Sequence, residues 1–279
     1  MPIIQSLREL EEFKKSHFHL RPWGLVPTMG ALHEGHISLI EKAAQENHIT
    51  WISIFVNPTQ FNNPKDLENY PHTLSSDLEA IQKIAPKACV FVPSVSFMYP
   101  EKIQAGTFDF LGLDKVMEGA YRPGHFQGVA TVVERLFELV GPDRAYFGEK
   151  DFQQLKIVEQ IAEKMKIDIQ ACPIVREANG LAMSSRNQRL NEVQKEQAAV
   201  IYNILSEVKN GFGETPTQEL YRVAEHALAP LNDFRLEYFE IANEQTLEKI
   251  TKYDPSVQYR AFISVWVNDV RLIDNMLLN

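Results

Sequence analysis

Short, nearly continuous apolar runs recur in the first part of the chain, and longer amphipathic segments separate them. The apolar runs cover residues 23–30, 50–58 and 89–94, and their β-branched and aromatic content is typical of strands buried on both faces. Residues 36–48 and 75–85 repeat their apolar side chains at helical spacing, with Ser75 or Ser76 as the expected N-cap of the second segment. The order strand, helix, strand, helix, strand predicts a parallel sheet with right-handed crossovers.

The same alternation continues to about residue 175. Residues 128–141 and 152–166 have helical spacing, residues 144–151 form a predicted strand and turn, and residues 168–175 form another strand. We therefore expect an α/β fold in which residues 1–175 form a doubly wound, parallel-sheet (Rossmann-like) nucleotide-binding domain.

The pattern changes in the last hundred residues. Residues 191–211 predict one long amphipathic helix, and a break rich in Gly, Pro and Thr separates it from a shorter helix at 220–230. Residues 234–243 and 259–278 alternate as strands do. This region, residues 176–279, predicts a smaller α+β domain, which we expect to act as a lid.

Charge and cysteine content narrow the function. The formal net charge is −9, with 28 Lys and Arg against 37 Asp and Glu. This balance argues against a nucleic-acid-binding protein, which needs clustered basic side chains, so anionic substrates require a local basic pocket. Cys89 and Cys172 are too few for a disulfide framework or a metal site, and we expect both to be small buried side chains.

The beginning of the chain predicts neither a signal peptide nor a membrane anchor. Residues 1–13 lack a basic stretch followed by an apolar one, and no apolar run reaches the roughly 18 residues of a membrane span. We expect a cytoplasmic protein with no membrane partner.

Two histidines, His33 and His36, follow the strand at 23–30 after a turn at Gly30, and Gly35 lies between them. A strand–turn–helix junction in a doubly wound sheet directs free N–H groups to the site where phosphates bind. Imidazoles at this place can donate hydrogen bonds to phosphate oxygens. A zinc protease motif needs histidines four residues apart, and His33 and His36 are three apart, so their spacing argues against a zinc protease. The remaining alternative is that the two histidines lie in an exposed turn and have no function.

Three further segments combine polar side chains with expected strand ends. Asn57 and Gln60 can orient a hydroxy acid or an amine without adding charge, or form a simple Asn-Pro turn. Lys150 suits a phosphate, Asp151 suits a helix N-cap, and Gln154 lies at the start of the same predicted helix.

The last segment follows a Gly-containing turn at Gly180. Ser184, Ser185 and Arg186 there could clamp phosphates, or the serine pair could cap a helix. Together, His33, His36, Lys150 and Arg186 would form the basic pocket that the net charge requires.

These blocks resemble the pantothenate synthetase family. PTMGALHEGH is similar to the version of the HIGH motif that this family shares with nucleotidyltransferases and class I aminoacyl-tRNA synthetases. MSSRN stands where those enzymes have KMSKS, with two serines and an arginine in place of a lysine-based loop. FVNPTQF, YRPGHFQGVATVV, GEKDFQQ and VREANGLAMSSRN match other blocks in the expected order, over about residues 21 to 190.

The resemblance implies an ATP-dependent ligase that condenses pantoate with β-alanine. Pantoate would first form pantoyl adenylate and release pyrophosphate, and β-alanine would then give pantothenate and AMP. It also implies Mg²⁺ as cofactor, pantoate, β-alanine and ATP as small-molecule partners, and a homodimer.

Residue by residue, the resemblance assigns catalysis to His36, the proton donor, together with His33, Lys150 and Arg186. It assigns ATP binding to Met29, Gly30, Ala31, Leu32, His33, Glu34, Gly35, His36, Gly148, Glu149, Lys150, Asp151, Val175, Met183, Ser184, Ser185 and Arg186. It assigns the binding of pantoate and β-alanine to Gln60 and Gln154, with Asn57 beside them. Asp77 is the candidate metal contact, or alternatively stabilises a helix dipole.

Two alternative functions are compatible with the same residues. A nucleotidyltransferase would transfer the nucleotide to a phosphate, release pyrophosphate and stop there, whereas the ligase forms AMP only when an amine is supplied. A regulatory module without catalysis would bind ATP and release no pyrophosphate, but the four basic side chains argue against it.

Overall fold

Six parallel strands form one sheet in the computed structural model, which describes residues 1–279. In sheet order they are β1 (Ile3–Ile4), β4 (Cys89–Phe91), β3 (Ile49–Ile54), β2 (Trp23–Thr28), β5 (Arg144–Gly148) and β6 (Asp168–Cys172). The predicted doubly wound parallel sheet is confirmed. The strand order reverses between β2 and β5, so their carboxyl ends border the crevice where ligands bind in such sheets.

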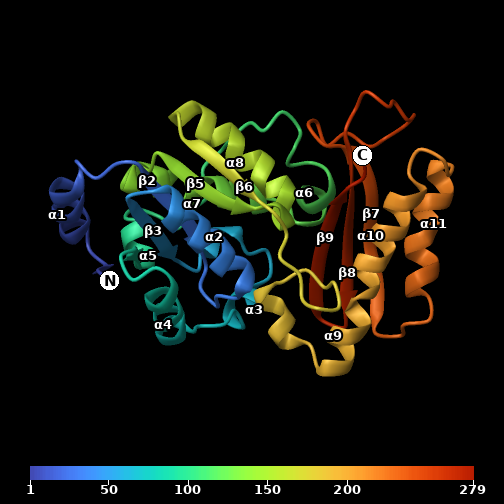
Figure 1. Ribbon diagram of the computed structural model, residues 1–279, viewed down its shortest axis with the longest axis horizontal. Helices are drawn as coiled ribbons and strands as arrows, with labels where there is room; N and C mark the ends of the chain where they lie inside the picture. The colour runs from blue at the N-terminus through green and yellow to red at the C-terminus, as the bar shows by residue number, and fades with distance from the viewer. The chain divides into compact units, whose positions relative to one another are not determined.

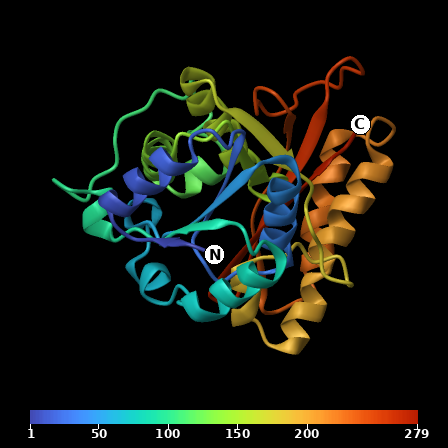
Figure 2. The same ribbon diagram turned by 60° about the vertical axis from the view of Figure 1, so that its left-hand side comes forward.

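Helices cover both faces of this sheet (Figures 1 and 2). The main ones are α1 (Leu7–His17), α2 (Glu34–Glu46), α4 (Leu74–Ile84), α7 (His125–Val140) and α8 (Phe152–Met165). Ile40 of α2 belongs to one buried cluster with Val26 and Ile52 of the strands. Trp51 points to the opposite face because side chains alternate along a strand, and there its ring contacts Phe13 of α1 at 5.0 Å between centroids.

Short elements complete this part of the chain. They are η1 (Pro58–Gln60), α3 (Pro64–Glu68), α5 (Val95–Met98), α6 (Met117–Tyr121) and η2 (Glu149–Asp151). The predicted N-cap of α4 is wrong, because Thr73 occupies that position. Ser76 lies within the first turn, where its hydroxyl donates to the carbonyl of Thr73 at 2.9 Å.

A separate antiparallel sheet forms the end of the chain from β7 (Phe234–Asn243), β8 (Tyr259–Val267) and β9 (Val270–Leu277). Before it come η3 (Ser185–Arg189), α9 (Glu192–Ala198), α10 (Val200–Gly211) and α11 (Thr217–Leu228). The single helix predicted over 191–211 is therefore two helices. Their junction is Ala199, whose N–H donates to Glu196 at 3.3 Å in a tightened last turn of α9.

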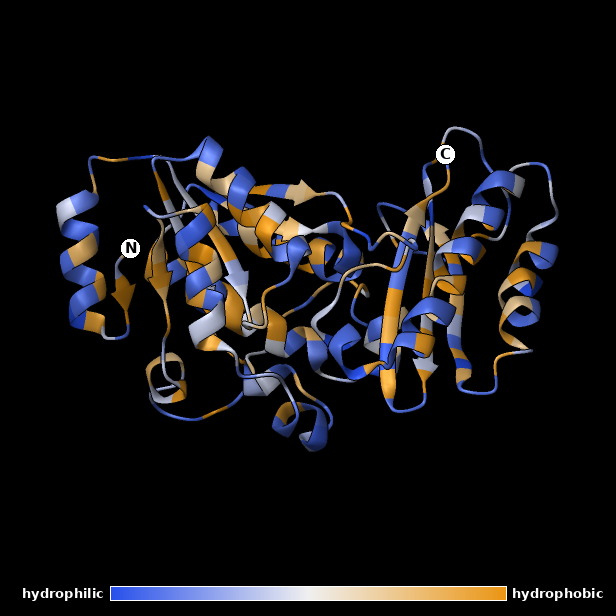
Figure 3. Cartoon of the chain, turned by 60° about the horizontal axis from the view of Figure 1, so that its bottom comes forward, coloured by the Kyte–Doolittle hydropathy of each residue, from blue (hydrophilic) through white to orange (hydrophobic).

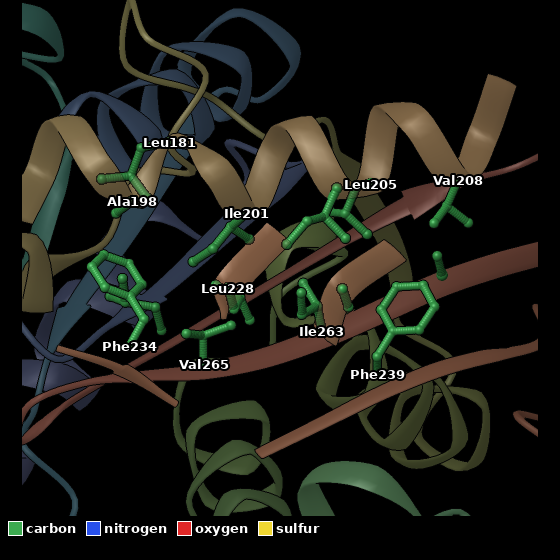
Figure 4. Close-up of a cluster of buried hydrophobic side chains, with 14 of the residues drawn as sticks. Leu181, Ala198, Ile201, Leu205, Val208, Leu228, Phe234, Phe239, Ile263 and Val265 are labelled. Carbon is green, nitrogen blue, oxygen red and sulfur yellow. The ribbon is translucent and has the colours of Figure 1, made fainter. Parts of the chain in front are cut away.

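The core of this region lies between the antiparallel sheet and α10 and α11. Ile201, Leu205 and Val208 of α10 face Ile263 and Val265 of β8 (Figure 4). The strands of both sheets are largely hydrophobic, whereas the connecting loops are mostly hydrophilic (Figure 3). None of the helices is long and apolar enough to cross a membrane.

The chain divides into two compact units. Unit 1 contains residues 1–149 and 154–173, and unit 2 contains residues 150–153 and 174–279. The start of α8 is therefore shared between the units, because Lys150–Gln153 belong to unit 2.

Candidate active site

The turn between β2 and α2 is braced from inside by a carboxylate. Gly30 and Ala31 both have positive φ, +80° and +49°, and the next two N–H groups along the turn, those of Ala31 and Leu32, point to one carboxylate. The buried carboxylate of Asp77 accepts from Ala31 at 3.0 Å and from Leu32 at 2.9 Å. The sequence predicts free N–H groups here for phosphate, and the structure shows that these two already have an acceptor.

The two histidines after this turn hold each other reciprocally. The N–H of Gly35 donates to Nδ1 of His33 at 3.1 Å, and the N–H of His33 donates to Nδ1 of His36 at 3.4 Å. A backbone N–H can only donate, so both Nδ1 atoms are acceptors and the proton of each neutral ring lies on Nε2. The ring centroids are 4.1 Å apart, which places two imidazole N–H donors next to each other.

The ends of β2 and β3 bring three predicted site residues into contact. Asn57 caps η1, is 1% exposed, and donates from Nδ2 to Oε1 of Gln60 at 3.0 Å. Nε2 of Gln60 lies 3.3 Å from Sδ of Met29. The two amides and the thioether therefore form one cluster in unit 1.

Gly148 ends β5 at the neighbouring strand end, Glu149 begins η2, and Gln154 is half-buried in the first turn of α8. Lys150 and Asp151 belong to unit 2, with Nζ of Lys150 3.5 Å from Asp151 Oδ1. The carbonyl of Lys150 accepts from Nδ2 of Asn275 at 2.9 Å.

The segment around Gly180 forms a small hairpin in unit 2. Arg176 pairs with Ala182, and the N–H of Met183 donates to the carbonyl of Val175 at 3.0 Å. Gly180 has φ +94°, as a tight turn of this kind requires. The predicted ATP contacts Val175 and Met183 therefore face each other across the hairpin.

An ion pair between partly buried Arg176 and buried Asp274 fastens this hairpin to β9. Arg176 donates to both oxygens of Asp274, at 2.5 and 3.0 Å, in the bidentate geometry that favours Arg over Lys. Directly after the hairpin, Oγ of Ser184 accepts from the N–H of Arg186 at 3.3 Å and caps η3, in which Ser185 is buried. Ser184, Ser185 and Arg186, the predicted clamp, therefore lie directly after an anchored hairpin.

Nearly the whole chain matches one family model. The model is that of pantoate–β-alanine ligase, and the match runs over residues 2–277. The chain belongs to the pantoate–β-alanine ligase family. It is accordingly an enzyme that ligates pantoate and β-alanine, and the family predicted from the sequence is confirmed.

Named relatives in this ligase family are similar over most of their length. The chain is 51% identical to the pantothenate synthetase of Flavobacterium psychrophilum over 91% of each chain. It is 46% identical to that of Christiangramia forsetii over 99% of this chain and 96% of the relative.

Solved structures of the ligase family show the same fold. Pantothenate synthetase from Thermus thermophilus matches with a TM-score of 0.89 and 38% identity, over 100% of this chain and 99% of the other. Pantoate–β-alanine ligase from Francisella tularensis, solved in complex with beta-gamma ATP and β-alanine, matches with a TM-score of 0.82 and 35% identity, over 99% and 97%.

No group of three or more His, Cys, Asp and Glu side chains is arranged to hold a metal ion. Both oxygens of Asp77, the metal contact suggested by the resemblance, accept hydrogen bonds from the turn. Thr73 donates a further bond to Asp77 at 3.1 Å. These contacts are those of a brace for the ligase's histidine turn.

Three residues around Gln60 have no predicted role in the sequence analysis. Tyr99 donates to Oδ1 of Asn57 at 2.5 Å, and Nδ1 of His125 lies 2.8 Å from the carbonyl of Gln60. Gly128 lies so close to η1 that an added Cβ would be 2.3 Å from the carbonyl oxygen of Thr59. The only sequence signal for two of them is the block YRPGHFQGVATVV, which gives no contact partner.

Proposed function

We propose that this ligase works through pantoyl adenylate, with ATP as the nucleotide. A carboxylate oxygen of pantoate forms a bond to the α-phosphorus of ATP, and the bond from that phosphorus to the leaving pyrophosphate breaks. The nitrogen of β-alanine then forms a bond to the acyl carbon, the acyl–oxygen bond breaks, and AMP leaves while the nitrogen gives up a proton. The complex of the Francisella tularensis relative supports the choice of nucleotide.

The observation that carries this proposal is the reciprocal pair His33 and His36 at the point where the strand order reverses. Two adjacent Nε2–H donors suit phosphate oxygens on which charge builds during transfer. They also act at neutral charge, because each ring needs its Nδ1 lone pair for a backbone N–H. We assign the proton-donating role to His36 in the sense of hydrogen bonding: its Nε2–H is donated to a phosphate oxygen and stays on the ring.

The remaining assignments follow the family resemblance, and charge supports those of the phosphate-binding residues. Lys150, Ser184, Ser185 and Arg186 would bind phosphates, because two cationic side chains and two hydroxyls offset the repulsion between a carboxylate and a triphosphate. Backbone and side-chain contacts to the nucleotide are assigned to Met29, Gly30, Ala31, Leu32, Glu34, Gly35, Gly148, Glu149, Asp151, Val175 and Met183. Gln60 and Gln154 would hold pantoate, with Gln60 near the amine and Asn57 behind it.

We propose Mg²⁺ as a companion of the triphosphate and not as a resident of the protein. Mg²⁺ keeps several waters and binds through substrate phosphates in many nucleotide enzymes. Both oxygens of Asp77 accept hydrogen bonds from Ala31 and Leu32, so we assign this carboxylate to the turn and not to the metal.

Further proposals rest on the family alone. They are a homodimer, which light scattering after gel filtration would test, a cytoplasmic location, and a division of labour between residues 1–175 and a lid formed by residues 176–279. Closure of such a lid would shelter the adenylate from water.

The deciding experiment follows ¹⁸O from the carboxylate of pantoate. If the adenylate forms, one labelled oxygen remains on the phosphate of AMP, and mass spectrometry detects it. Omission of β-alanine should abolish AMP release, since the amine is needed to open the adenylate. Unlabelled AMP would contradict the proposal. Pyrophosphate release with no AMP formed when β-alanine is present would also contradict it, and this second result would favour a nucleotidyltransferase.

A further inference from the structure

The side-chain amide of Asn57 has only one possible orientation. Its Oδ1 accepts from the backbone N–H of Thr59 at 3.4 Å, and its Nδ2 donates to the backbone carbonyl of Gly128 at 3.1 Å. A backbone N–H only donates and a backbone carbonyl only accepts, so reversing this buried amide would place like groups against each other on both sides.

This orientation determines which end of Gln60 is exposed to a ligand. Nδ2 of Asn57 donates to Oε1 of Gln60 at 3.0 Å, so the side-chain oxygen of Gln60 already accepts a hydrogen bond from within the protein. The other end, Nε2, contacts Sδ of Met29 at 3.3 Å. A thioether is a weak acceptor, so a ligand oxygen can replace it with a gain in hydrogen-bond strength.

Tyr99 stabilises the arrangement from the far side. Its Oη lies 2.5 Å from Oδ1 of Asn57 and 3.0 Å from Oγ1 of Thr59. Burial raises the pKa of the Tyr99 phenol, so the group keeps its proton and stays a donor at neutral pH. The tyrosine therefore adds a donor to Oδ1 in the orientation of Asn57 that the two backbone contacts fix.

The backbone of Gln60 is fixed as well. Nδ1 of His125 lies 2.8 Å from its carbonyl oxygen, and Gly128 allows α7 to approach η1 closely. Both the main chain and the amide oxygen of Gln60 are therefore held, and its NH₂ group is the part left to the substrate.

We propose that Tyr99 and Asn57 are positioning residues that fix the amide of Gln60 with its NH₂ group toward pantoate, so that Gln60 serves the substrate only as a hydrogen-bond donor. The inference rests on the proposed function, in which Gln60 binds pantoate. We call these three residues the amide relay. A reversed Gln60 would present a carbonyl oxygen to an acid whose carboxylate is itself an acceptor.

A double-mutant cycle tests the amide relay. Tyr99→Phe removes the phenol proton and keeps the ring, and it should raise the KM for pantoate about fivefold to tenfold, as loss of one hydrogen bond does. The KM for ATP should change less than about twofold. In a Gln60→Ala background the same substitution should have almost no effect on the KM for pantoate, because the residue through which Tyr99 acts is absent.

Tyr146→Phe is the matched control. Tyr146 is a fully buried tyrosine of unit 1 whose hydroxyl also contacts an asparagine, Asn47, at 2.7 Å. It lies outside the amide relay, so its replacement should leave the KM for pantoate unchanged while costing similar stability. This control separates a role in positioning from general loosening of unit 1.

Asn57→Asp provides a second, independent test. The substitution replaces Nδ2 by an oxygen of similar size, so Gln60 can turn and present its own oxygen to pantoate. The KM for pantoate should rise at least as much as in Gln60→Ala, about tenfold or more. If this variant does not fold, the Tyr99 cycle decides alone.

Several results would overturn the inference. An unchanged KM for pantoate in Tyr99→Phe, or an equal effect in the Gln60→Ala background, would exclude a role through Gln60. An unchanged KM in Gln60→Ala with pantothenate still formed would refute the amide relay and leave the ligase function standing. A wild-type protein that forms no pantothenate would refute both.

Discussion

The histidines of the β2–α2 turn show how a backbone can set side-chain chemistry. Backbone donors occupy Nδ1 of His33 and Nδ1 of His36, so both neutral rings present Nε2–H. The carboxylate of Asp77 meanwhile accepts hydrogen bonds from the N–H groups of Ala31 and Leu32. The proposed site therefore presents imidazole N–H donors that are oriented before a ligand binds. Donors oriented in advance stabilise the negative charge that develops in the transition state.

At His36 we expect replacement by Ala to lower adenylate formation about a hundredfold or more, because a positioned acid or donor contributes that much to catalysis. Pyrophosphate release with ATP and pantoate measures the step. His19→Ala, at an exposed histidine, is the control and should keep full activity. Circular dichroism should show both variants folded, and near-normal turnover of folded His36→Ala would refute the assignment.

For the two thiols we expect very slow alkylation in the folded protein. Burial raises the pKa of Cys89 and of Cys172, so both stay protonated and unreactive well above neutral pH. Iodoacetamide at pH 8 should label them at least about a hundredfold faster in urea than in the native state. Intact-mass spectrometry follows the labelling, and rapid native modification of either thiol would contradict their placement.

Whether a contact between two site residues can be predicted from the sequence depends on how far apart the two residues are along the chain. The spacing of His33 and His36 is local, so the sequence shows it. Asp77 acts on Ala31 across 46 positions, and Tyr99 acts on Asn57 across 42. No local pattern records such pairs, and they become visible only when the fold brings them together. The buried state of both cysteines, by contrast, follows from their apolar surroundings.

At the scale of elements, the contact between α7 and η1 determines the shape of the pantoate side of the proposed site. A Cβ on Gly128 would lie 2.5 Å from the carbonyl carbon of Thr59 and 2.7 Å from the nitrogen of Gln60. These neighbours are backbone atoms, so they cannot rotate away as a side chain could. The glycine is required by this close approach of helix and turn.

Gly128→Ala should therefore displace η1 and weaken the binding of pantoate. Forced overpacking costs about 1–3 kcal/mol, which urea unfolding of the variant would measure. The KM for pantoate should rise several-fold as Gln60 moves. Glu138→Ala, at an exposed position of α7, should change neither quantity by much. Wild-type stability and KM in Gly128→Ala would show that the turn tolerates the shift.

Long periodic elements could be predicted from the sequence, and short ones could not. The helices α2, α7 and α8 repeat an apolar face over several turns, and the strands β3 and β4 are continuous apolar runs. The helices α3 and α6 have five residues each, too few to show a period. The break at Ala199 leaves no trace either, because the apolar spacing of α9 continues into α10.

At the scale of the whole molecule, net charge limits the range of partners. With a formal charge of −9, we expect no measurable binding of double-stranded DNA or of transfer RNA. Fluorescence anisotropy with labelled nucleic acid at about 50 mM salt, where phosphate contacts are strongest, is a stringent measurement. Saturable binding in the micromolar range would reveal a basic surface that the composition does not suggest.

The division into units has a consequence for how this enzyme can be recombined. Unit 2 is interrupted in sequence: the carbonyl of Lys150 bonds to Asn275, and the ring of Phe152 lies 3.9 Å below the guanidinium of Arg260. A chimera that takes only residues 174–279 from a relative therefore lacks that relative's residues 150–153, which contact Asn275 and Arg260 in unit 2. Exchanges between homologues should succeed only when residues 150–153 come from the same relative as residues 174–279, so two stretches that are separate in the sequence must be exchanged together.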